Sequence, residues 1–165
     1  MSIKTKTTDE RYTPQYLIEI IRESLGGGID FDPVSNQDNQ VNATQYFTAK
    51  ENCLIRKWYE VEAAYMNPPF SNSYPFLKKW HEAYLNKRFK RGITLTLAGA
   101  VFNKRTQDFF RDANFLIIPK GRIEFDFPDN LSRSGNDRDV ILAFWGEELP
   151  ESRKILSKIG MIVSI

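Results

Sequence analysis

The chain has 165 residues, of which 41% are hydrophobic and 27% are charged, and its net charge is +2. This length suits one domain over residues 1–165 and is short for a catalytic domain joined to a separate recognition domain. No apolar run approaches the ~18 to 20 residues that span a bilayer, residues 1–10 do not resemble a signal peptide, and the single cysteine, Cys53, excludes an internal disulfide. We therefore expect a cytoplasmic protein that needs no membrane.

The first predicted element is an amphipathic helix that starts at Thr13-Pro14. Threonine would cap this helix and proline would occupy its first position. Apolar residues then recur on one face, at Tyr16, Leu17, Ile20, Ile21 and Leu25. The glycines at 26–28 end the helix.

The rest of the chain alternates between strand and helix patterns. Strands are expected at 29–33, 44–48, 61–66, 92–97, 114–118, 122–125 and 140–145, and helices at 76–87 and 104–111. This alternation predicts an α/β fold with a largely parallel sheet and helices on both faces. We expect residues 1–10 to be flexible, and residues 127–139, which are rich in Asp, Asn, Ser and Gly, to form a mobile loop.

The most informative segment is Asn67-Pro68-Pro69-Phe70, which follows the strand at 61–66. Two prolines hold the backbone extended and leave its carbonyls free to accept hydrogen bonds. The Asn67 side-chain oxygen is a further acceptor, and Phe70 supplies a flat face for a planar ring. The segment therefore predicts a site for an aromatic amine, aimed at an electrophile without a strong base.

A second polar turn, Asp30-Phe31-Asp32-Pro33, ends an earlier strand. Its carboxylates suit the ammonium group of an amino-acid-like cofactor or a ribose hydroxyl, and Asp32 is favoured over Asp30. Ligands of open α/β sheets collect at the carboxyl ends of strands. If the two strands are neighbours, an electrophilic donor at this turn would lie close to a nucleophile held at Asn67.

Three blocks of the sequence resemble the phage-type DNA N-6-adenine-methyltransferase (Dam-like) family. They are Tyr12-Thr13-Pro14, Asp30 to Asn36, and Asn67-Pro68-Pro69-Phe70-Ser71, and the similarity covers about residues 9–146. The resemblance implies a Rossmann-like methyltransferase fold and transfer of a methyl group from S-adenosyl-L-methionine to the exocyclic amine of adenine. It also implies a phage or prophage origin and a role in evading host restriction.

The resemblance further assigns roles to individual residues. Asn67, Pro68, Pro69 and Phe70 would hold the flipped adenine, with Asn67 and the Pro68 carbonyl accepting from its amine and Phe70 stacking on its ring. The cofactor pocket would be formed by Tyr12, Thr13, Pro14, Asp30, Asp32, Pro33, Ser35 and Asn52. Three features depart from the family pattern: there is no glycine-rich loop after the first cofactor strand, Phe70 replaces the commoner Tyr, and the segment around Asn52 lacks the usual acidic residue and glycine.

DNA is the expected partner, with no obligate protein partner. Basic residues that could contact phosphates lie at Lys78, Lys79, Lys87, Arg88, Lys90, Arg91, Arg105, Arg122, Arg133 and Arg138. The run at 78–91 equally fits a solvated helix face. His81, the sole histidine, is expected on an exposed helix face and not as a metal ligand.

Other functions remain open at this stage. The same amine site would serve cytosine, adenine in RNA, or the glutamine amide of a protein. A methyltransferase-like module that binds nucleic acid or cofactor without turnover is the alternative from a different class.

Overall fold

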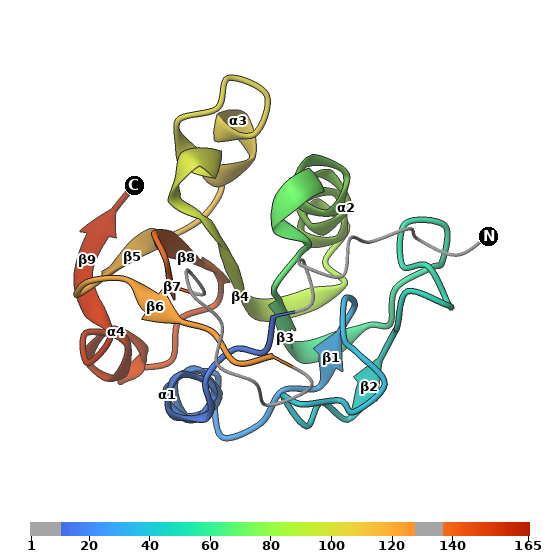
Figure 1. Ribbon diagram of the computed structural model, residues 1–165, viewed down its shortest axis with the longest axis horizontal. Coiled ribbons are helices and arrows are strands. Elements are labelled where there is room, and N and C mark those ends of the chain that lie inside the picture. The colour runs from blue at the N-terminus through green and yellow to red at the C-terminus, as the bar shows by residue number, and fades with distance from the viewer. Residues whose placement is uncertain (1–10, 128–136) are drawn as a thin grey trace.

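The computed structural model describes residues 11–127 and 137–165. The predicted flexibility of residues 1–10 lies outside this part of the chain, as does most of the predicted loop at 127–139, including Arg133. Figure 1 shows the elements, which follow in the order α1 (Gln15–Ser24), β1 (Phe31–Asp32), β2 (Gln45–Tyr46), β3 (Val61–Met66), η2 (Phe70–Asn72), α2 (Tyr74–Leu85), β4 (Phe89–Leu97), η3 (Ala98–Val101), α3 (Gln107–Phe110), β5 (Phe115–Pro119), β6 (Ile123–Glu124), β7 (Asp137–Arg138), β8 (Val140–Gly146), α4 (Ser152–Leu156) and β9 (Gly160–Ser164).

Seven strands form one sheet in the order β2-β1-β3-β4-β8-β5-β9. Strands β1 to β4 pair in parallel, with Phe31 opposite Ala64 and Ala64 opposite Gly92. Strand β8 runs antiparallel between β4 and β5, and β9 runs antiparallel to β5 at the edge. The predicted α/β fold with a largely parallel sheet is confirmed, with β8 and β9 as the reversed strands.

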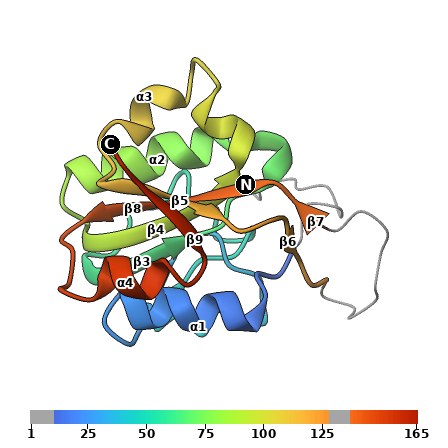
Figure 2. The ribbon, with the colours of Figure 1, turned by 90° about the vertical axis from the view of Figure 1, so that its left-hand side faces the viewer.

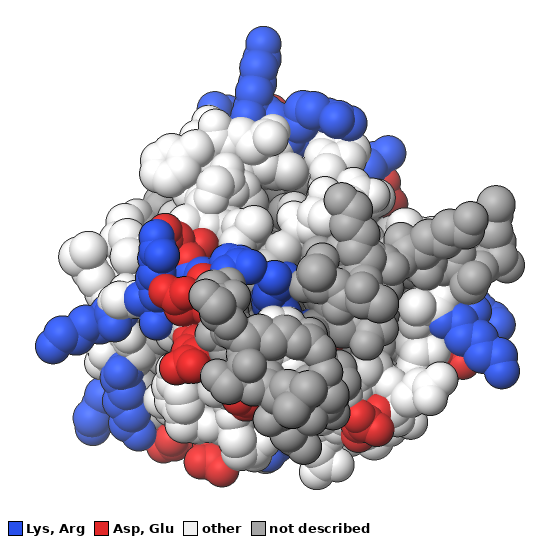
Figure 3. Space-filling model, in the orientation of Figure 1, with Lys and Arg blue, Asp and Glu red and all other residues white. Residues whose placement is uncertain are grey.

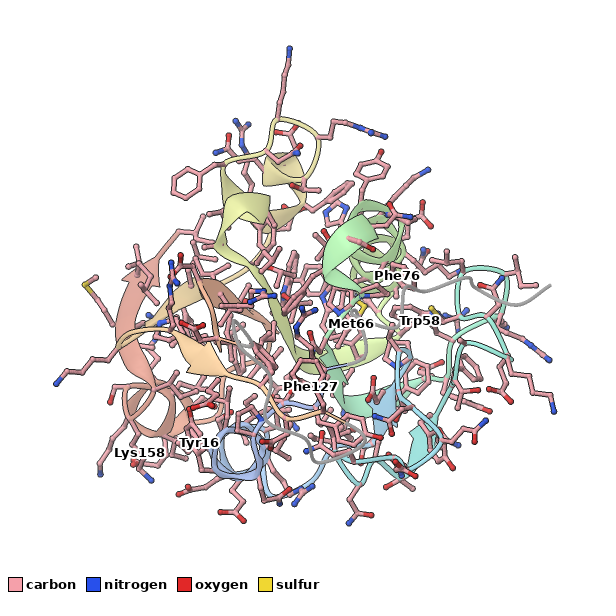
Figure 4. The ribbon with its side chains drawn as sticks, viewed as in Figure 1. Tyr16, Trp58, Met66, Phe76, Phe127 and Lys158 are labelled. Carbon is pink, nitrogen blue, oxygen red and sulfur yellow. The ribbon has the colours of Figure 1, made fainter. Side chains whose placement is uncertain are left out.

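Helices cover both faces of the sheet (Figure 2). Helices α1 and α4 lie on one face and α2 and α3 on the other. Alternate residues of β3 enter different cores: Tyr65 packs on the α1 side, and Met66 packs on the α2 side. Figure 4 shows Trp58, Met66 and Phe76 together near α2, in the second of these cores. A strand buried on both faces explains why residues 63–66 read as a continuous apolar run.

Helix α1 differs in detail from its prediction. Its buried face carries Leu17, Ile18 and Ile21, whereas Tyr16 is 56% exposed. The prediction for Tyr16 was wrong because an aromatic ring is not a reliable sign of the inward face on a short helix. The N-cap position is Pro14, and Thr13 makes no capping hydrogen bond.

The end of the chain holds elements that the sequence did not indicate. Helix α4 has only five residues, too few for a period of 3.6 to stand out, and β9 follows it. The helix predicted at 104–111 is limited to α3. Asp137 and Arg138, which were expected in a loop, form β7 and pair with β6.

No helix in the described part of the chain is both long and apolar enough to cross a membrane.

Candidate active site

The two polar turns lie side by side at the carboxyl ends of β1 and β3. Because Phe31 is the register partner of Ala64, Asp32 is level with Tyr65. Asn67 is the first residue after β3 and lies two residues beyond Tyr65. The strands that carry the turns are therefore neighbours, and their polar side chains belong to one site.

Thr13 connects the start of α1 to this site. Its Oγ1 lies 2.7 Å from the Tyr65 hydroxyl, and it accepts a hydrogen bond from Asn67 Nδ2 at 3.3 Å. The Thr13 side chain is buried, and it points to β3 instead of capping the helix. Tyr65 was not among the predicted site residues, since in the sequence it is one more apolar position of a strand.

The side-chain oxygen of Asn67 is buried and has no hydrogen-bond partner in the structure. The amide nitrogen, by contrast, is held by Thr13, and no main-chain group binds it in the described residues. A buried acceptor without a donor costs about 1–3 kcal/mol. Such an atom is suited to accept an N–H from a ligand.

The prolines lead from Asn67 into η2. Pro69 has φ −53° and ψ 125°, and its carbonyl accepts from the Asn72 amide at 3.2 Å. The expectation that both proline carbonyls lack local partners was therefore wrong for Pro69. Phe70, the first residue of η2, is partly buried and meets Phe125 edge to face with ring centroids 5.4 Å apart. The Arg11 guanidinium lies 5.4 Å from the Phe70 ring centroid.

Phe70 also borders a hollow of about 290 Å³. We call it the η2–η3 hollow, because its walls come from residues 70–74 and from the segment that follows β4. Among its lining residues are Phe70, Ser73, Tyr74, Leu97, Asn103 and Arg105. The Arg105 guanidinium sits 4.0 Å from the Tyr74 ring centroid. A planar group entering this hollow would meet aromatic faces.

Asp32 is a buried carboxyl group, only 4% exposed. Burial raises its pKa to about 7, although hydrogen bonds from the Val34 amide, at 3.0 Å, and from Ser35 act in the opposite direction. Burial is also the main cause that raises the pKa of Tyr65, and the nearby Asp32 charge adds to it. A buried carboxyl group with a raised pKa is typical of a ligand site.

Asp30 has a different role from Asp32. Its Oδ2 accepts from the Ala63 amide at 2.9 Å and so ties the start of β1 to β3. The preference for Asp32 over Asp30 as the ligand-facing acid is consistent with this contact, because Asp30 is used within the sheet.

The other predicted cofactor residues surround Asp32 and Thr13. Tyr12 pairs through its backbone with Asp126, at 2.8 and 3.0 Å, and donates its hydroxyl to Asp38. Pro14 is the N-cap of α1, Pro33 and Ser35 follow Asp32 in the loop after β1, and the Ser35 amide donates to the Phe47 carbonyl at 2.8 Å. Asn52, at φ 54°, lies in a turn after β2, where its side chain accepts from the Leu54 amide at 3.2 Å.

Most of the predicted phosphate contacts do not lie at this site. Arg88, Lys90 and Arg91 sit at the amino ends of β3 and β4, paired with Glu60 and Glu62. Lys78 pairs with Glu82 on α2, and Arg122 pairs with Asp137 and Asp139. The space-filling view shows Lys and Arg in several scattered groups instead of one stripe (Figure 3). Of the described candidates, Arg105 is the one that lines the η2–η3 hollow.

His81 is not the exposed residue that was expected. Its side chain is 17% exposed, its Nε2 lies 2.5 Å from Asp112 Oδ2, and its ring packs near Phe109 and Trp145. No cluster of three or more His, Cys, Asp or Glu side chains that could hold a metal is found within residues 11–127 and 137–165.

This sheet order, with a buried acid as the last residue of β1 and an Asn-Pro-Pro-Phe turn after β3, defines a Rossmann-like methyltransferase fold. The crystal structure of a Pyrococcus horikoshii protein, described provisionally as an RNA methyltransferase, shares this fold: the TM-score is 0.52 at 16% identity, over 88% of this chain and 91% of that one. The model of the family described as DNA N-6-adenine-methyltransferase (Dam) matches residues 2–161, and the chain belongs to that family. A comparison with curated proteins finds no match.

Proposed function

We propose that this protein methylates the exocyclic amine of adenine in DNA with S-adenosyl-L-methionine as methyl donor. The buried Asn67 oxygen without a donor carries the proposal, because an amine N–H is the group that would satisfy it. Family membership supports the reaction and its substrate.

On the base side, Asn67 and the Pro68 carbonyl accept the two N–H bonds of the adenine amine. The Thr13 hydroxyl fixes the Asn67 amide, so the acceptor is positioned before the base arrives. Pro69 keeps the turn extended, and Phe70 stacks on the ring of a base that has left the duplex. Stacking and hydrogen bonds offset the cost of taking the base out of its stack.

On the cofactor side, Asp32 and Thr13 are the central residues, with Tyr12, Pro14, Pro33, Ser35 and Asn52 around them. The residues fit the group: Asp32 offers a buried acid to hydroxyl or ammonium donors, and Asp30 holds the turn in place through Ala63. S-adenosyl-L-methionine supplies an electrophilic methyl group on a sulfonium, so no metal is needed for the transfer.

The chemistry follows from the acceptors. Hydrogen bonds to Asn67 and Pro68 draw the amine nitrogen out of conjugation with the ring and direct its lone pair to the methyl carbon. Held by Asp32 and Thr13, the cofactor would supply its methyl carbon to this lone pair, so that a new N–C bond would replace the S–C bond and the sulfur would retain the electron pair of the broken bond. Neither acceptor is a strong base, so the extra proton leaves the nitrogen for water after transfer.

A methyl-transfer assay with labelled cofactor on DNA, RNA and protein in parallel tests the proposal, followed by mapping of the modified base. We expect label in DNA, at the adenine amine. Label confined to RNA, cytosine or glutamine would refute the substrate, and cofactor binding without transfer to any of them would leave a silent binding module.

We further propose that the chain acts as one domain in the cytoplasm of a bacterial host, where methylation protects DNA from restriction. Methylation of host DNA upon expression, followed by resistance of that DNA to an adenine-methylation-sensitive nuclease, tests this setting.

A further inference from the structure

Phe102 is unusual among the large apolar side chains of this protein. It is 82% exposed, whereas the other exposed apolar side chains in the described residues range from 38% to 69%. One exposed phenylalanine is in itself ordinary. Its position makes it a candidate for a function, because in the chain it lies between Ala100 and Asn103. These two residues line the η2–η3 hollow together with Phe70.

The segment that carries Phe102 is held by a closed set of hydrogen bonds. The Phe102 amide donates to the Gly99 carbonyl at 3.1 Å, and Gln107 Nε2 donates to the Val101 carbonyl at 2.8 Å. Thr106 donates its hydroxyl to the Ala100 carbonyl.

Asn103 closes the same loop from the other side. Its side-chain oxygen accepts from the Arg105 amide at 2.8 Å, and its carbonyl accepts from the Gln107 amide at 2.9 Å. The loop therefore presents an aromatic ring to solvent from a fixed base, which lowers the entropy lost when the ring inserts into a partner.

Two cations follow the exposed ring in the chain. Lys104 and Arg105 follow it within three residues, and no carboxylate of the described residues forms an ion pair with either. This differs from the cations at the other end of β4, which are paired with glutamates. An exposed apolar ring, followed in the chain by two cations without carboxylate partners, one of which lies on the Tyr74 ring, suits the surface of a DNA duplex, where phosphates border stacked bases.

We propose that Phe102 is a wedge that enters the duplex beside the target adenine and fills the space that the base leaves when it moves toward Phe70. This inference rests on the proposed function and adds to it a duplex substrate and a positioning residue outside the amine site. Phe102 would stabilise the opened duplex, and the chemistry itself would remain with Asn67 and Pro68.

Methylation of one DNA fragment, as native duplex and as separated strands, tests the wedge. For Phe102→Ala we expect transfer to the duplex to fall by at least about tenfold, with transfer to single strands kept within about twofold, because single strands need no wedge. Phe102→Trp keeps a flat ring and should restore transfer to the duplex. Equal loss on both substrates, no loss on either, or a wild-type enzyme that ignores duplex DNA would overturn the proposal.

Leu85→Ala is the matched control, since Leu85 is 59% exposed but lines a hollow at the amino ends of β3 and β4. It should behave as the wild type on both substrates.

A second measurement does not depend on methyl transfer. A wedge unwinds DNA, so closed circular plasmid relaxed by a topoisomerase in the presence of wild-type protein should show a shifted linking number, and the shift should be absent with Phe102→Ala. An identical shift with both proteins, or none with the wild type, refutes the wedge. Absence of methyl transfer to any DNA by the wild type would instead refute the proposed function.

Discussion

The polar groups at the amino ends of β3 and β4 differ from those at the carboxyl ends of β1 and β3 in whether they have partners within the protein. At the amino ends, Lys90 Nζ lies 2.7 Å from Glu62, Arg91 joins the same carboxylate, and Arg88 pairs with Glu60. At the carboxyl ends, the Asn67 oxygen is buried without a donor and Asp32 is buried with a raised pKa.

At the amino ends the protein supplies partners for these charged groups, whereas at the carboxyl ends a buried polar atom has no partner. A hollow of about 940 Å³ lies at the amino ends between Glu60, Leu85 and Gly146, where Glu62 and Lys90 are already paired with each other. The η2–η3 hollow at the carboxyl ends is smaller, but its wall includes Phe70, which follows the unsatisfied Asn67 by three residues in the chain. Unsatisfied chemistry is therefore a better guide to the site than volume.

The largest expected effect concerns Asp32 and pH. Its pKa of about 7 in the folded state lies above the value near 4 of an unfolded chain. Between those values the unfolded state releases the proton that the folded state keeps, so stability falls as pH rises from about 4 to 7, by up to about 4 kcal/mol from this group. Asp32→Asn lacks this contribution, and its stability relative to the wild type should rise over that interval.

Urea unfolding of cofactor-free protein at pH 4.5 and pH 8 measures this change. If the free energies of unfolding of the wild type and Asp32→Asn differ by the same amount at both pH values, ionisation of the Asp32 carboxyl does not destabilise the folded protein. Asp30→Asn provides the comparison, because the side chain of Asp30 is not fully buried and its oxygen is bonded to Ala63.

Asn67→Ala should lower methyl transfer by about a hundredfold or more, as expected when a positioned hydrogen-bonding group at the reacting atom is removed. Cofactor affinity, measured by calorimetry, should stay near that of the wild type, because the proposed site places Asn67 on the base side and not on the cofactor side. Phe70→Ala should likewise lower methyl transfer and leave cofactor affinity near that of the wild type. An active Asn67→Ala enzyme would contradict the proposed amine site.

Thr13→Val should have a smaller effect, of about tenfold on transfer, because it removes the hydroxyl that orients Asn67 and keeps the volume. Tyr65→Phe is the companion variant, since Tyr65 bonds to the same hydroxyl from the other side. If Thr13 acts through Asn67, the Thr13→Val and Asn67→Ala changes will not add in the double variant. Additive losses would show that Thr13 acts through its place in the proposed cofactor pocket and not through Asn67.

Glu62→Gln should have the smallest effect. It removes the partner of Lys90 and Arg91 at the amino end, where all three groups reach solvent to some degree and such pairs stabilise little. Methyl transfer should equal that of the wild type. A clear loss of activity would mean that the two ends of the strands are not independent.

The sequence predicts the fold class and the two polar turns of the candidate site, but it does not predict the direction of every strand. Asn67 and Asp32 could be recognised because prolines, acids and amides after apolar strands are unusual there, and the structure brings them to neighbouring strands. The direction of β8 could not be predicted, since an apolar run such as Val140–Gly146 reads the same in either direction. Tyr65 was missed because the partner of its hydroxyl, Thr13, is 52 residues away in the sequence, and only the fold brings the two side chains together.

The paired backbone contacts between Tyr12 and Asp126 have an evolutionary consequence. Because both bonds run from amide to carbonyl, they are indifferent to which side chains stand at these two positions. Substitutions at these two positions would therefore leave the segment that carries Thr13 aligned with Asn67.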